Sequence, residues 1–307
     1  MSGRGITREP RIALVVLNYN DSETTQRFIE GAACLAAVNN IVLVDNGSTD
    51  GSLSRLNTAA FPHVRTLALD SNGGYARGNN AGLRYAVETL GADYVFVANP
   101  DTRLSDDAVR AIAEFLGTHE DAGAVTCEMK SGASFPTDSG WQLPGYWQCV
   151  AQSIPGFDKL SRRVARPGEQ GSAPLQDGAR RCDAVAGSFF GISSSVLQSI
   201  GYLDDDTFLY YEENILGARL REHGKSCYVL SGYEYVHDHQ VSILKSLPNV
   251  RKRLRIAEES REIYCKKYLD TSAVGVAFMR ICSEIGIFVY SVIKSIFAVG
   301  RKHCKYV

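Results

Sequence analysis

Short apolar runs alternate with longer amphipathic runs between residues 11 and 110, and this alternation restricts the fold more than any other feature of the chain. Apolar runs such as IALVVLNYN, NIVLVDNGSTDGS and DYVFVANPDT are separated by longer runs such as TTQRFIEGAACLAAV and ARGNNAGLRYAVETL. Strands that alternate with helices in this way form βαβ units, in which the strands lie parallel. We therefore expect an α/β fold with a mostly parallel sheet flanked by helices.

Polar residues follow three of the predicted strands at the point where each strand ends. They are Asn18 to Asn20, Asp45 to Gly47 and Asn99 to Asp101. In open α/β sheets, ligands bind beyond the carboxyl ends of the strands. We therefore predict that these three clusters lie at one edge of the sheet and form a ligand site.

The sequence pattern changes beyond residue 110. Residues 130–181 are rich in Gly, Pro, Ser and Gln, which predicts a long loop, and loops of this length inside a domain are usually functional or mobile. Strand and helix patterns then return as far as residue 245, and the remainder is helical. We expect a tail, a main domain of two parts and a C-terminal helical extension, with the boundaries 1–10, 11–245 (parts 11–110 and 111–245) and 246–307.

Composition and charge exclude several classes of protein. The 307 residues are 45% hydrophobic and 22% charged with a net charge of −1, so no global field attracts nucleic acid and we expect no nucleic-acid partner. The eight cysteines never form C-x-x-C, which argues against a zinc site or a disulfide scaffold and favours reduced, cytoplasmic thiols. The first apolar run, Ile12 to Leu17, is shorter than the core of a signal peptide.

Two loops have the composition of a nucleotide site. Asp45 at a strand end can accept hydrogen bonds from a base or a ribose, although Asp45 and Asp50 can instead cap the next helix. The segment SNGGYARGNNAG, residues 71–82, allows close approach of the backbone at Gly74, and Arg77 beside a helix N-terminus favours diphosphate oxygens. The segment matches neither a P-loop nor a clean G-x-G-x-x-G motif.

Asp101 is a candidate ligand of Mg²⁺ or Mn²⁺, because these cations prefer oxygen donors and use one or two carboxylates together with substrate phosphates. Asn99 adds a neutral carbonyl. His237 and His239 form a His-x-His pair after a strand, which places both imidazoles on one face for a metal or a diphosphate. The structural alternatives are a turn at residues 99–101 and two solvent-facing histidines.

The adjacent carboxylates Glu212 and Glu213 open a predicted helix and are the candidates for a general base. Adjacent helical residues point about 100° apart, so one carboxylate can face a cleft while the other pairs or caps. An exposed acidic first turn is the alternative. The residues alone leave the choice between the two glutamates open.

The segment from Val276 to Lys302 predicts an amphipathic helix. Polar residues gather on one side, and a wide apolar arc occupies the rest. Arg280, Glu284 and Lys294 interrupt the apolar run of about 20 residues that a membrane span requires. We therefore expect a helix that lies on a surface. A bilayer is favoured, with the catalytic domain or a second subunit as alternatives.

The ordered motifs N-Y-N, V-D-N-G-S-T-D-G-S, G-G-x-A-x-G-N-N-A-G, N-P-D and Y-x-E-E together resemble the family 2 inverting glycosyltransferases with a GT-A fold. The closest likeness is to bacterial enzymes of surface-polysaccharide assembly, including the rhamnosyltransferase-like group. The resemblance covers roughly residues 11–245. The ordered set is much more specific than any single motif.

The resemblance implies a nucleotide-sugar donor of the dTDP-rhamnose or UDP-sugar type, bound by residues 11–110. It implies a glycan or polyprenyl-diphosphate-linked acceptor near residues 111–245, Mg²⁺ or Mn²⁺ as cofactor, and inversion at the anomeric carbon. The donor-binding candidates are Asn18, Asn20, Asp45, Gly74, Arg77, Asn79, Asn99 and Asp101. The resemblance implies that Asp101 binds the metal together with His239 or His237. It implies Glu213 as the general base, with Glu212 as the alternative.

Gly187, Trp141 and Trp147 are the candidates for acceptor contact, since aromatic faces pack well on sugar rings, with core packing as the alternative for both tryptophans. Asn99 replaces the first acid of the family's D-x-D position, so we expect weak metal binding without nucleotide. A peripheral location on the inner face of the plasma membrane would suit a lipid-linked acceptor. A nucleotidyltransferase and a noncatalytic sugar-binding or scaffold protein are the competing functions.

Overall fold

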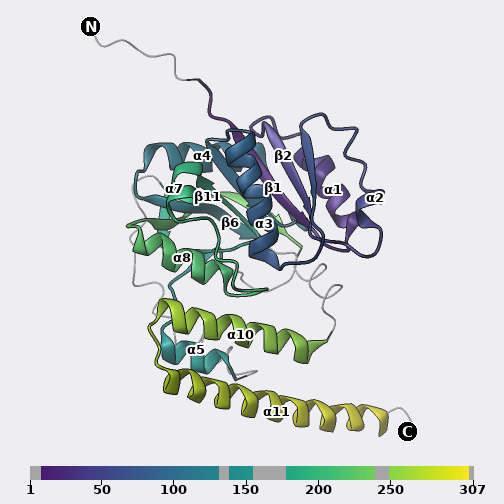
Figure 1. Ribbon diagram of the computed structural model, residues 1–307, viewed down its shortest axis with the longest axis vertical. Helices are drawn as coiled ribbons and strands as arrows, with labels where there is room; N and C mark the ends of the chain where they lie inside the picture. Colours follow the sequence, from purple (N-terminus) through teal and green to yellow (C-terminus); the bar gives the residue numbers. More distant parts are fainter. Residues whose placement is uncertain (1–7, 131–137, 155–177, 239–248, 304–307) are drawn as a thin grey trace.

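The computed structural model describes residues 8–130, 138–154, 178–238 and 249–303, with side chains as far as residue 290. A twisted sheet lies between two layers of helices, and three further helices are stacked on one end of this unit (Figure 1). His239 and most of the predicted loop 130–181 lie outside the described residues.

The main sheet of the described residues has nine strands, with a parallel half and a mixed half, and β7 and β9 form a separate two-stranded sheet. The order is β3-β2-β1-β4-β10-β6-β11-β5, and β8 pairs with β11. The parallel half comprises β1 (Ile12–Asn18), β2 (Asn40–Asp45), β3 (Val64–Ala68) and β4 (Tyr94–Ala98). The mixed half comprises β5 (Thr102–Arg103), β6 (Ala122–Lys130), β8 (Ala179–Cys182), β10 (Phe189–Ser193) and β11 (Ser226–His237). β10 runs antiparallel to both of its neighbours, β4 and β6.

Alternate residues of the strands are buried against opposite helix layers, as the period of two along a strand requires. Leu14 and Val16 pack in the core beneath α1 (Ser22–Ala32) and α4 (Asp106–Thr118), whereas Ala13 and Val15 pack in the second core. The second core lies beneath α3 (Tyr75–Arg84), α7 (Ser194–Ser199) and α8 (Glu212–Glu222). Shorter elements are α2 (Ser52–Arg55), a π-helical turn (Tyr85–Thr89), β7 (Gly140–Trp141) and β9 (Ala184–Val185). The expected fold class is confirmed.

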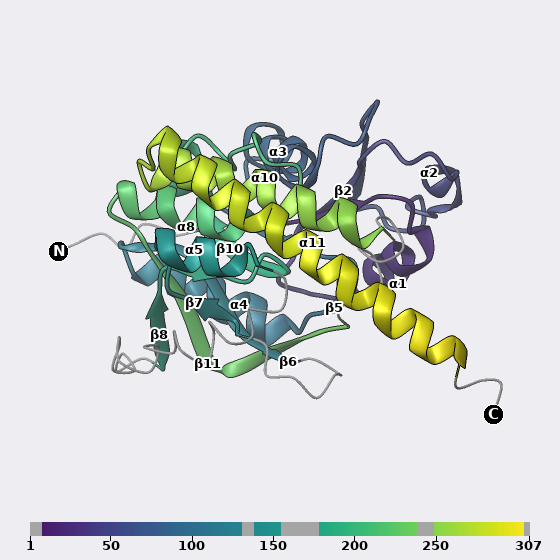
Figure 2. The same ribbon diagram turned by 90° about the horizontal axis from the view of Figure 1, so that it is seen from below.

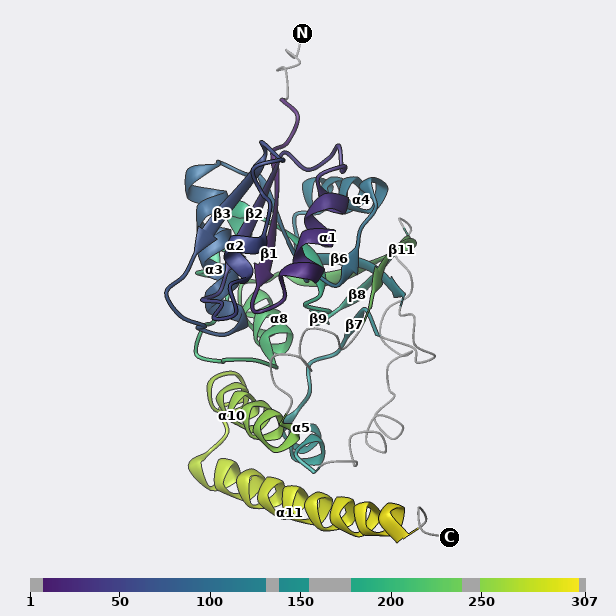
Figure 3. The same ribbon diagram turned by 90° about the vertical axis from the view of Figure 1, so that its right-hand side faces the viewer.

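A separate layer is formed by α5 (Tyr146–Gln152), α10 (Val250–Tyr268) and α11 (Ala273–His303). Views from two sides show α11 farthest from the sheet, with α10 and α5 between (Figures 1 and 3). A small core joins this layer to α8, with Cys149, Ile215, Tyr264 and Met279 buried together. The described part of the predicted loop 130–181 therefore contains α5, and α5 packs with the C-terminal helices.

Candidate active site

Asn18 and Asp45 end two neighbouring parallel strands and face each other in register. The side-chain amide of Asn18 donates to Asp45 Oδ1 at 2.6 Å, and the backbone N–H of Ser48 donates to Oδ2 at 3.0 Å. Asp45, only 3% exposed, therefore organises the turn that follows it. The capping alternative applies to Asp50, whose Oδ1 accepts from the N–H of Ser52 at the start of α2 at 2.8 Å. Contact of Asp45 with a base stays a prediction.

Asn20 fixes the same turn from the β1 side. Its backbone N–H donates to Ser48 Oγ at 3.0 Å, and its side-chain oxygen accepts from the N–H of Thr49 at 2.8 Å. Asn20 has a φ of 52°, in the left-handed region that asparagine tolerates better than most residues. The loops after β1 and β2 therefore form one hydrogen-bonded unit at the sheet edge.

Asn46 is a site residue that the sequence reasoning did not single out. Its buried side-chain amide donates to Asn72 Oδ1 at 3.0 Å and to the carbonyl oxygen of Gly74 at 3.1 Å. Asn46 thereby ties the loop after β2 to the glycine-rich segment. The only sequence signal was its place in the V-D-N cluster.

The glycine-rich segment begins α3 and touches the chain that leads to the paired glutamates. Gly74 has a φ of +90°, and a side chain there would collide with the backbone of Phe208. The N–H of Tyr75 donates to the carbonyl oxygen of Phe208 at 2.9 Å. Gly74 is therefore needed for both its backbone conformation and this close approach.

The other candidates on α3 lie in different environments. Arg77 is exposed, whereas Asn79 is fully buried. The amide nitrogen of Asn79 donates to the carbonyl oxygen of Tyr75 at 3.0 Å, and its Oδ1 has no hydrogen-bond partner among the described residues. Asn80 exchanges two side-chain hydrogen bonds with the backbone of Leu203, at 2.9 and 3.0 Å. Only Arg77 of these three presents its side chain to solvent.

Asp101 and His237 are brought together by the pairing of β5 with β11, which joins Thr102 to His237 in register. Asp101 Oδ1 lies 3.1 Å from His237 Nε2, and the two side chains are 8% and 11% exposed. Asn99 bonds through its backbone, donating to the carbonyl oxygen of Ser188 at 2.9 Å.

A carboxylate and an imidazole at the carboxyl end of a central strand are a donor set that suits a divalent cation. Asp101 and His237 therefore fit the predicted metal. One carboxylate leaves most of the coordination to other ligands, which agrees with the expectation of weak metal binding without nucleotide.

Glu212 and Glu213 begin α8 and differ in environment. Burial, reinforced by the neighbouring charge of Glu213, raises the pKa of Glu212 to about 8, and its Oε1 has no hydrogen-bond partner among the described residues. Burial also raises the pKa of Glu213, but a hydrogen bond from the backbone N–H of Gly187 opposes that rise. Glu212 therefore favours its protonated form near neutral pH, and Glu213, which lies against Gly187, is the candidate base.

Gly187 and Tyr75 connect the base to the glycine-rich segment. A Cβ at Gly187 would lie 2.9 Å from Glu213 Oε1, so only glycine leaves room for this carboxylate. The Tyr75 hydroxyl donates to the carbonyl oxygen of Gly187 at 2.6 Å. Burial and the charges of both glutamates raise the pKa of Tyr75, so this hydroxyl keeps its proton. Gly187, predicted near the acceptor, therefore contacts the candidate base.

The chain before α8 is held in an uncommon conformation. Tyr210 and Tyr211 have φ values of 74° and 70°, a region that bulky residues rarely adopt. The Tyr211 hydroxyl donates to Gln152 of α5 and accepts from Arg261 Nε of α10 at 3.2 Å. Helices of the C-terminal layer therefore fix the residue that precedes Glu212.

Comparison with known proteins assigns this arrangement to a family. The sequence profile described as Glycosyl transferase family 2 matches residues 13–148, the segment that carries the first four motifs. Residues 13–148 therefore carry a family 2 glycosyltransferase domain.

Two curated relatives support the assignment. The chain is 25% identical to the low-salt glycan biosynthesis hexosyltransferase Agl10 of Haloferax volcanii, over 66% of this chain and 59% of that protein. It is also 25% identical to an N-acetylglucosaminyl-diphospho-decaprenol L-rhamnosyltransferase of Mycobacterium tuberculosis, over 74% of this chain and 75% of that one. The chain thus spans less than two thirds of the length of the archaeal relative.

Solved structures share the fold at low sequence identity. GalNAc-T7 with UDP, GalNAc and Mn²⁺ matches with a TM-score of 0.57 and 13% identity, over 84% of this chain and 50% of that chain. The mannosyltransferase PcManGT from Pyrobaculum calidifontis, with GDP-Man and Mn²⁺, matches with a TM-score of 0.53 and 12% identity, over 92% and 81%. The expected GT-A fold is confirmed by these likenesses.

The two tryptophans of this chain differ in exposure and in their contacts. Trp141 is half-buried, and its indole N–H donates to Asn214 Oδ1 at 2.8 Å, next to Glu213 on α8. Trp147 is 72% exposed on α5, and its ring contacts Phe278 of α11 with centroids 6.3 Å apart. Only Trp141 therefore has a hydrogen bond to the helix of the candidate base.

A second acidic group serves as a structural tie. The carboxylates of Asp204, Asp205 and Asp206 offer oxygens within 4.8 Å of one another. Lys267 of α10 pairs with Asp204 and with Asp206, and the Tyr268 hydroxyl donates to Asp204. These contacts join the loop before α8 to the C-terminal layer.

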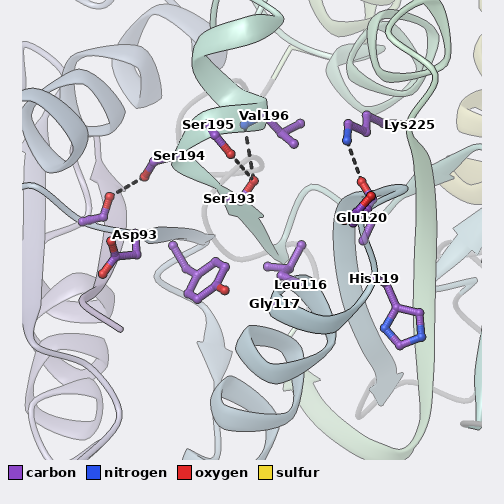
Figure 4. A pocket seen from close by; sticks show the side chains of 13 residues that line it. Asp93, Leu116, Gly117, His119, Glu120, Ser193, Ser194, Ser195, Val196 and Lys225 are labelled. Carbon is purple, nitrogen blue, oxygen red and sulfur yellow. Dashed lines mark hydrogen bonds between the residues drawn. The ribbon is translucent and has the colours of Figure 1, made fainter. Parts of the chain in front are cut away.

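A pocket of about 570 Å³ lies at the opposite end of β4 from Asp101 (Figure 4). Several of its polar side chains have partners within the protein. Ser194 donates to the carbonyl oxygen of Ala92, Lys225 donates to that of Glu120 at 2.6 Å, and Asp93 pairs with Arg8. Because it lies at the start of β4, the pocket is remote from the predicted donor edge, which lies at the other end of that strand.

Proposed function

We propose that this family 2 glycosyltransferase moves a sugar from a nucleotide-sugar donor to a glycan or lipid-linked acceptor, with inversion at the anomeric carbon. The observation that supports it best is the placement of Glu213 against Gly187. This buried carboxylate is connected through Tyr75 to the glycine-rich segment. The proposed donor is of the dTDP-rhamnose or UDP-sugar type.

In the proposed reaction, the carboxylate of Glu213 takes the proton of an acceptor hydroxyl. The acceptor oxygen attacks the anomeric carbon from the face opposite the nucleotide, and the bond from that carbon to the diphosphate oxygen breaks. One carboxylate is enough because no covalent glycosyl-enzyme forms. The raised pKa of Glu213 makes it a stronger base than an exposed glutamate.

The donor would lie along the edge formed by the ends of β1, β2 and β4, with its diphosphate near the start of α3. Asp101 and His237 would hold Mg²⁺ or Mn²⁺, which when bound offsets the charge of the departing diphosphate. Arg77 is exposed at the start of α3, where an arginine and a helix N-terminus both favour phosphate oxygens.

We also propose that the protein works on the inner face of the plasma membrane, in the cytoplasm, in surface-polysaccharide synthesis. The mycobacterial relative is named for a decaprenol-linked substrate, which supports a lipid-linked acceptor. By length and composition alone, Ala273–Tyr290 of α11 is apolar enough to cross a membrane, with a mean hydropathy of 1.6. A helix lying on the bilayer fits better, because one side of α11 packs on α5 and α10.

A panel of nucleotide sugars, assayed for transfer and for the nucleotide released, tests the proposal. Glu213→Gln is expected to abolish transfer and retain donor binding. Glu222→Gln, an exposed glutamate on the same helix, is the matched control and is expected to remain active. Pyrophosphate release from a nucleoside triphosphate would instead indicate a nucleotidyltransferase. Absence of turnover with every donor and acceptor would indicate a noncatalytic protein.

A further inference from the structure

One continuous apolar surface of the described residues belongs to α5 and α11 together. It consists of large apolar side chains on the outer side of α11 and one tryptophan of α5. We call it the α5–α11 face; its members are Trp147, Val274, Phe278, Ile281, Ile285, Phe288 and Val289. Trp147 and Phe278 are in edge-to-face contact, so the two helices contribute to one surface.

The opposite side of α11 packs against other helices of the protein. Val276, Met279 and Ile287 are buried, and Arg280 donates to Glu262 of α10 at 2.8 Å. Because α5 and α10 lie between α11 and the sheet, the α5–α11 face points away from the catalytic domain (Figures 2 and 3). The inner side of α11 therefore packs on the protein, in a core shared with α5 and α8, whereas the α5–α11 face stays exposed among the described residues.

We propose that the α5–α11 face is the bilayer-contacting surface of the protein, with Trp147 as its interfacial anchor. This inference deepens the proposed membrane location and assigns Trp147 to lipid, whereas the sequence suggested the acceptor sugar. Tryptophan suits this role because its amphipathic ring favours the headgroup level of a bilayer.

The charges around the face favour an anionic bilayer over a second copy of this chain. Arg251, Lys252 and Arg255 are exposed near the start of α10. Since α10 and α11 run antiparallel, the start of α10 lies beside the second half of α11 (Figure 1). Basic residues beside an apolar helical face attract anionic headgroups, and two copies meeting through this face would bring like charges together.

The same short helix serves the membrane face and the active site. Trp147 projects from α5 to the outside, whereas Gln152 at the other end of α5 accepts from the Tyr211 hydroxyl. Tyr211 directly precedes Glu212 and Glu213. A protein bound through this face would therefore hold its base at a fixed position relative to the bilayer, as a lipid-linked acceptor requires.

Co-sedimentation of the full chain with phosphatidylcholine vesicles, with and without phosphatidylglycerol, tests the proposal. We expect binding that is stronger with phosphatidylglycerol. Replacing both Ile281 and Ile285 by Glu is expected to weaken partitioning by about 100-fold, since each isoleucine loses its burial in lipid. Leu53→Glu on α2, also an exposed apolar residue, is the matched control and is expected to bind as the wild type does.

Tryptophan fluorescence tests whether Trp147 is the residue that enters the bilayer. Vesicles are expected to shift the tryptophan emission to shorter wavelength in the wild type and in Trp141→Phe, but not in Trp147→Phe. No vesicle binding by the wild type, or equal binding by the double glutamate variant, would overturn the proposal. So would a dimer in light scattering that this variant dissociates. Sugar transfer to a water-soluble acceptor is measured separately. If Glu213→Gln loses this transfer but still binds vesicles, the result bears on the proposed function and not on the membrane face.

Discussion

Two adjacent glutamates at the start of α8 have different neighbours. Glu213 receives a hydrogen bond from the N–H of Gly187, while Glu212 Oε1 lacks a partner among the described residues. Backbone N–H groups of Glu212 and Tyr210 oppose the rise in the pKa of Glu212, but burial and the charge of Glu213 outweigh them. Glu213 stays the predicted base.

Glu212→Gln is expected to stabilise the protein increasingly as the pH rises. The folded-state pKa of Glu212 is raised to about 8, so its contribution to stability is present below the pKa of the unfolded chain and is lost as the pH rises toward 8. Glutamine does not ionise and avoids this loss. We expect the Tm advantage of the variant to grow by roughly 4 °C between pH 5 and pH 8 in calorimetry.

The exposed Glu222→Gln is the control and should show a Tm difference that does not change with pH. A constant Tm difference for Glu212→Gln would contradict the raised pKa.

Tyr75→Phe is expected to lower kcat by about tenfold and to move the acid limb of the pH profile to higher pH. Without the Tyr75 hydroxyl, the Gly187 peptide is no longer held against Glu213, so the anionic form of the base is less stabilised and its pKa rises further. Tyr202→Phe removes a hydroxyl that donates to Glu88 outside the site, and should leave the profile unchanged. An unshifted acid limb in Tyr75→Phe would show that this tyrosine acts only in packing.

At the scale of elements, α10 stabilises the chain that precedes α8. Arg261 lies over the Tyr211 ring at 5.5 Å from its centroid and pairs with the buried carboxylate of Glu258. Ser260 donates to the carbonyl oxygen of Leu209 at 2.8 Å. The left-handed Tyr210 and Tyr211 are thus held by a helix that is remote in sequence.

Arg261→Met is expected to reduce the free energy of unfolding by about 3 kcal/mol, because it leaves the Glu258 carboxylate buried without its partner. Adding Glu258→Gln should recover part of this loss, and urea denaturation of the two single variants and the double variant measures the coupling. Arg280→Met is the comparison. Its partner is Glu262, but the Arg280 side chain is 60% exposed and screened by solvent, so the loss of unfolding free energy should be clearly smaller than for Arg261→Met. Equal losses of unfolding free energy in Arg261→Met and Arg280→Met would contradict this explanation.

At the scale of the whole molecule, the site is assembled from both halves of the sheet. The parallel half supplies the ends of β1, β2 and β4, while the mixed half supplies Gly187 before β10 and His237 at the end of β11. The third layer, α5 with α10 and α11, fixes the start of α8 and carries the proposed membrane face.

Metal binding is expected to depend on the donor nucleotide, because Asp101 is the single carboxylate of the predicted metal position. Calorimetry should show weak binding of Mn²⁺ to the protein alone and at least about tenfold tighter binding with a nucleoside diphosphate present. Asp101→Asn should abolish this gain. Asp205→Asn, in the exposed acidic group, should retain it. Tight binding of Mn²⁺ without nucleotide would contradict the prediction.

Particular residues show how much the sequence could predict. Asn18, Asp45 and Asp101 were placed at one sheet edge because the carboxyl ends of parallel strands must coincide. Asn46 was missed as a site residue, since an amide that bridges two loops has no local signature. Trp147 was predicted in a long loop but lies on the helix α5, which packs with helices far away in the sequence; its contact with an acceptor stays a prediction.

The sequence by itself determined the alternation of strands and helices, the polar strand ends and the order of the family motifs, because each depends on local periodicity or spacing. Only the tertiary structure decided that β10 enters antiparallel between β4 and β6, bringing Gly187 to Glu213 and Tyr75. It also decided that α5 joins the C-terminal helices and leaves Trp147 on the outer surface. The physical reason is that burial and hydrogen bonding arise from contacts between segments far apart in the chain, and these contacts set the pKa of each carboxyl group.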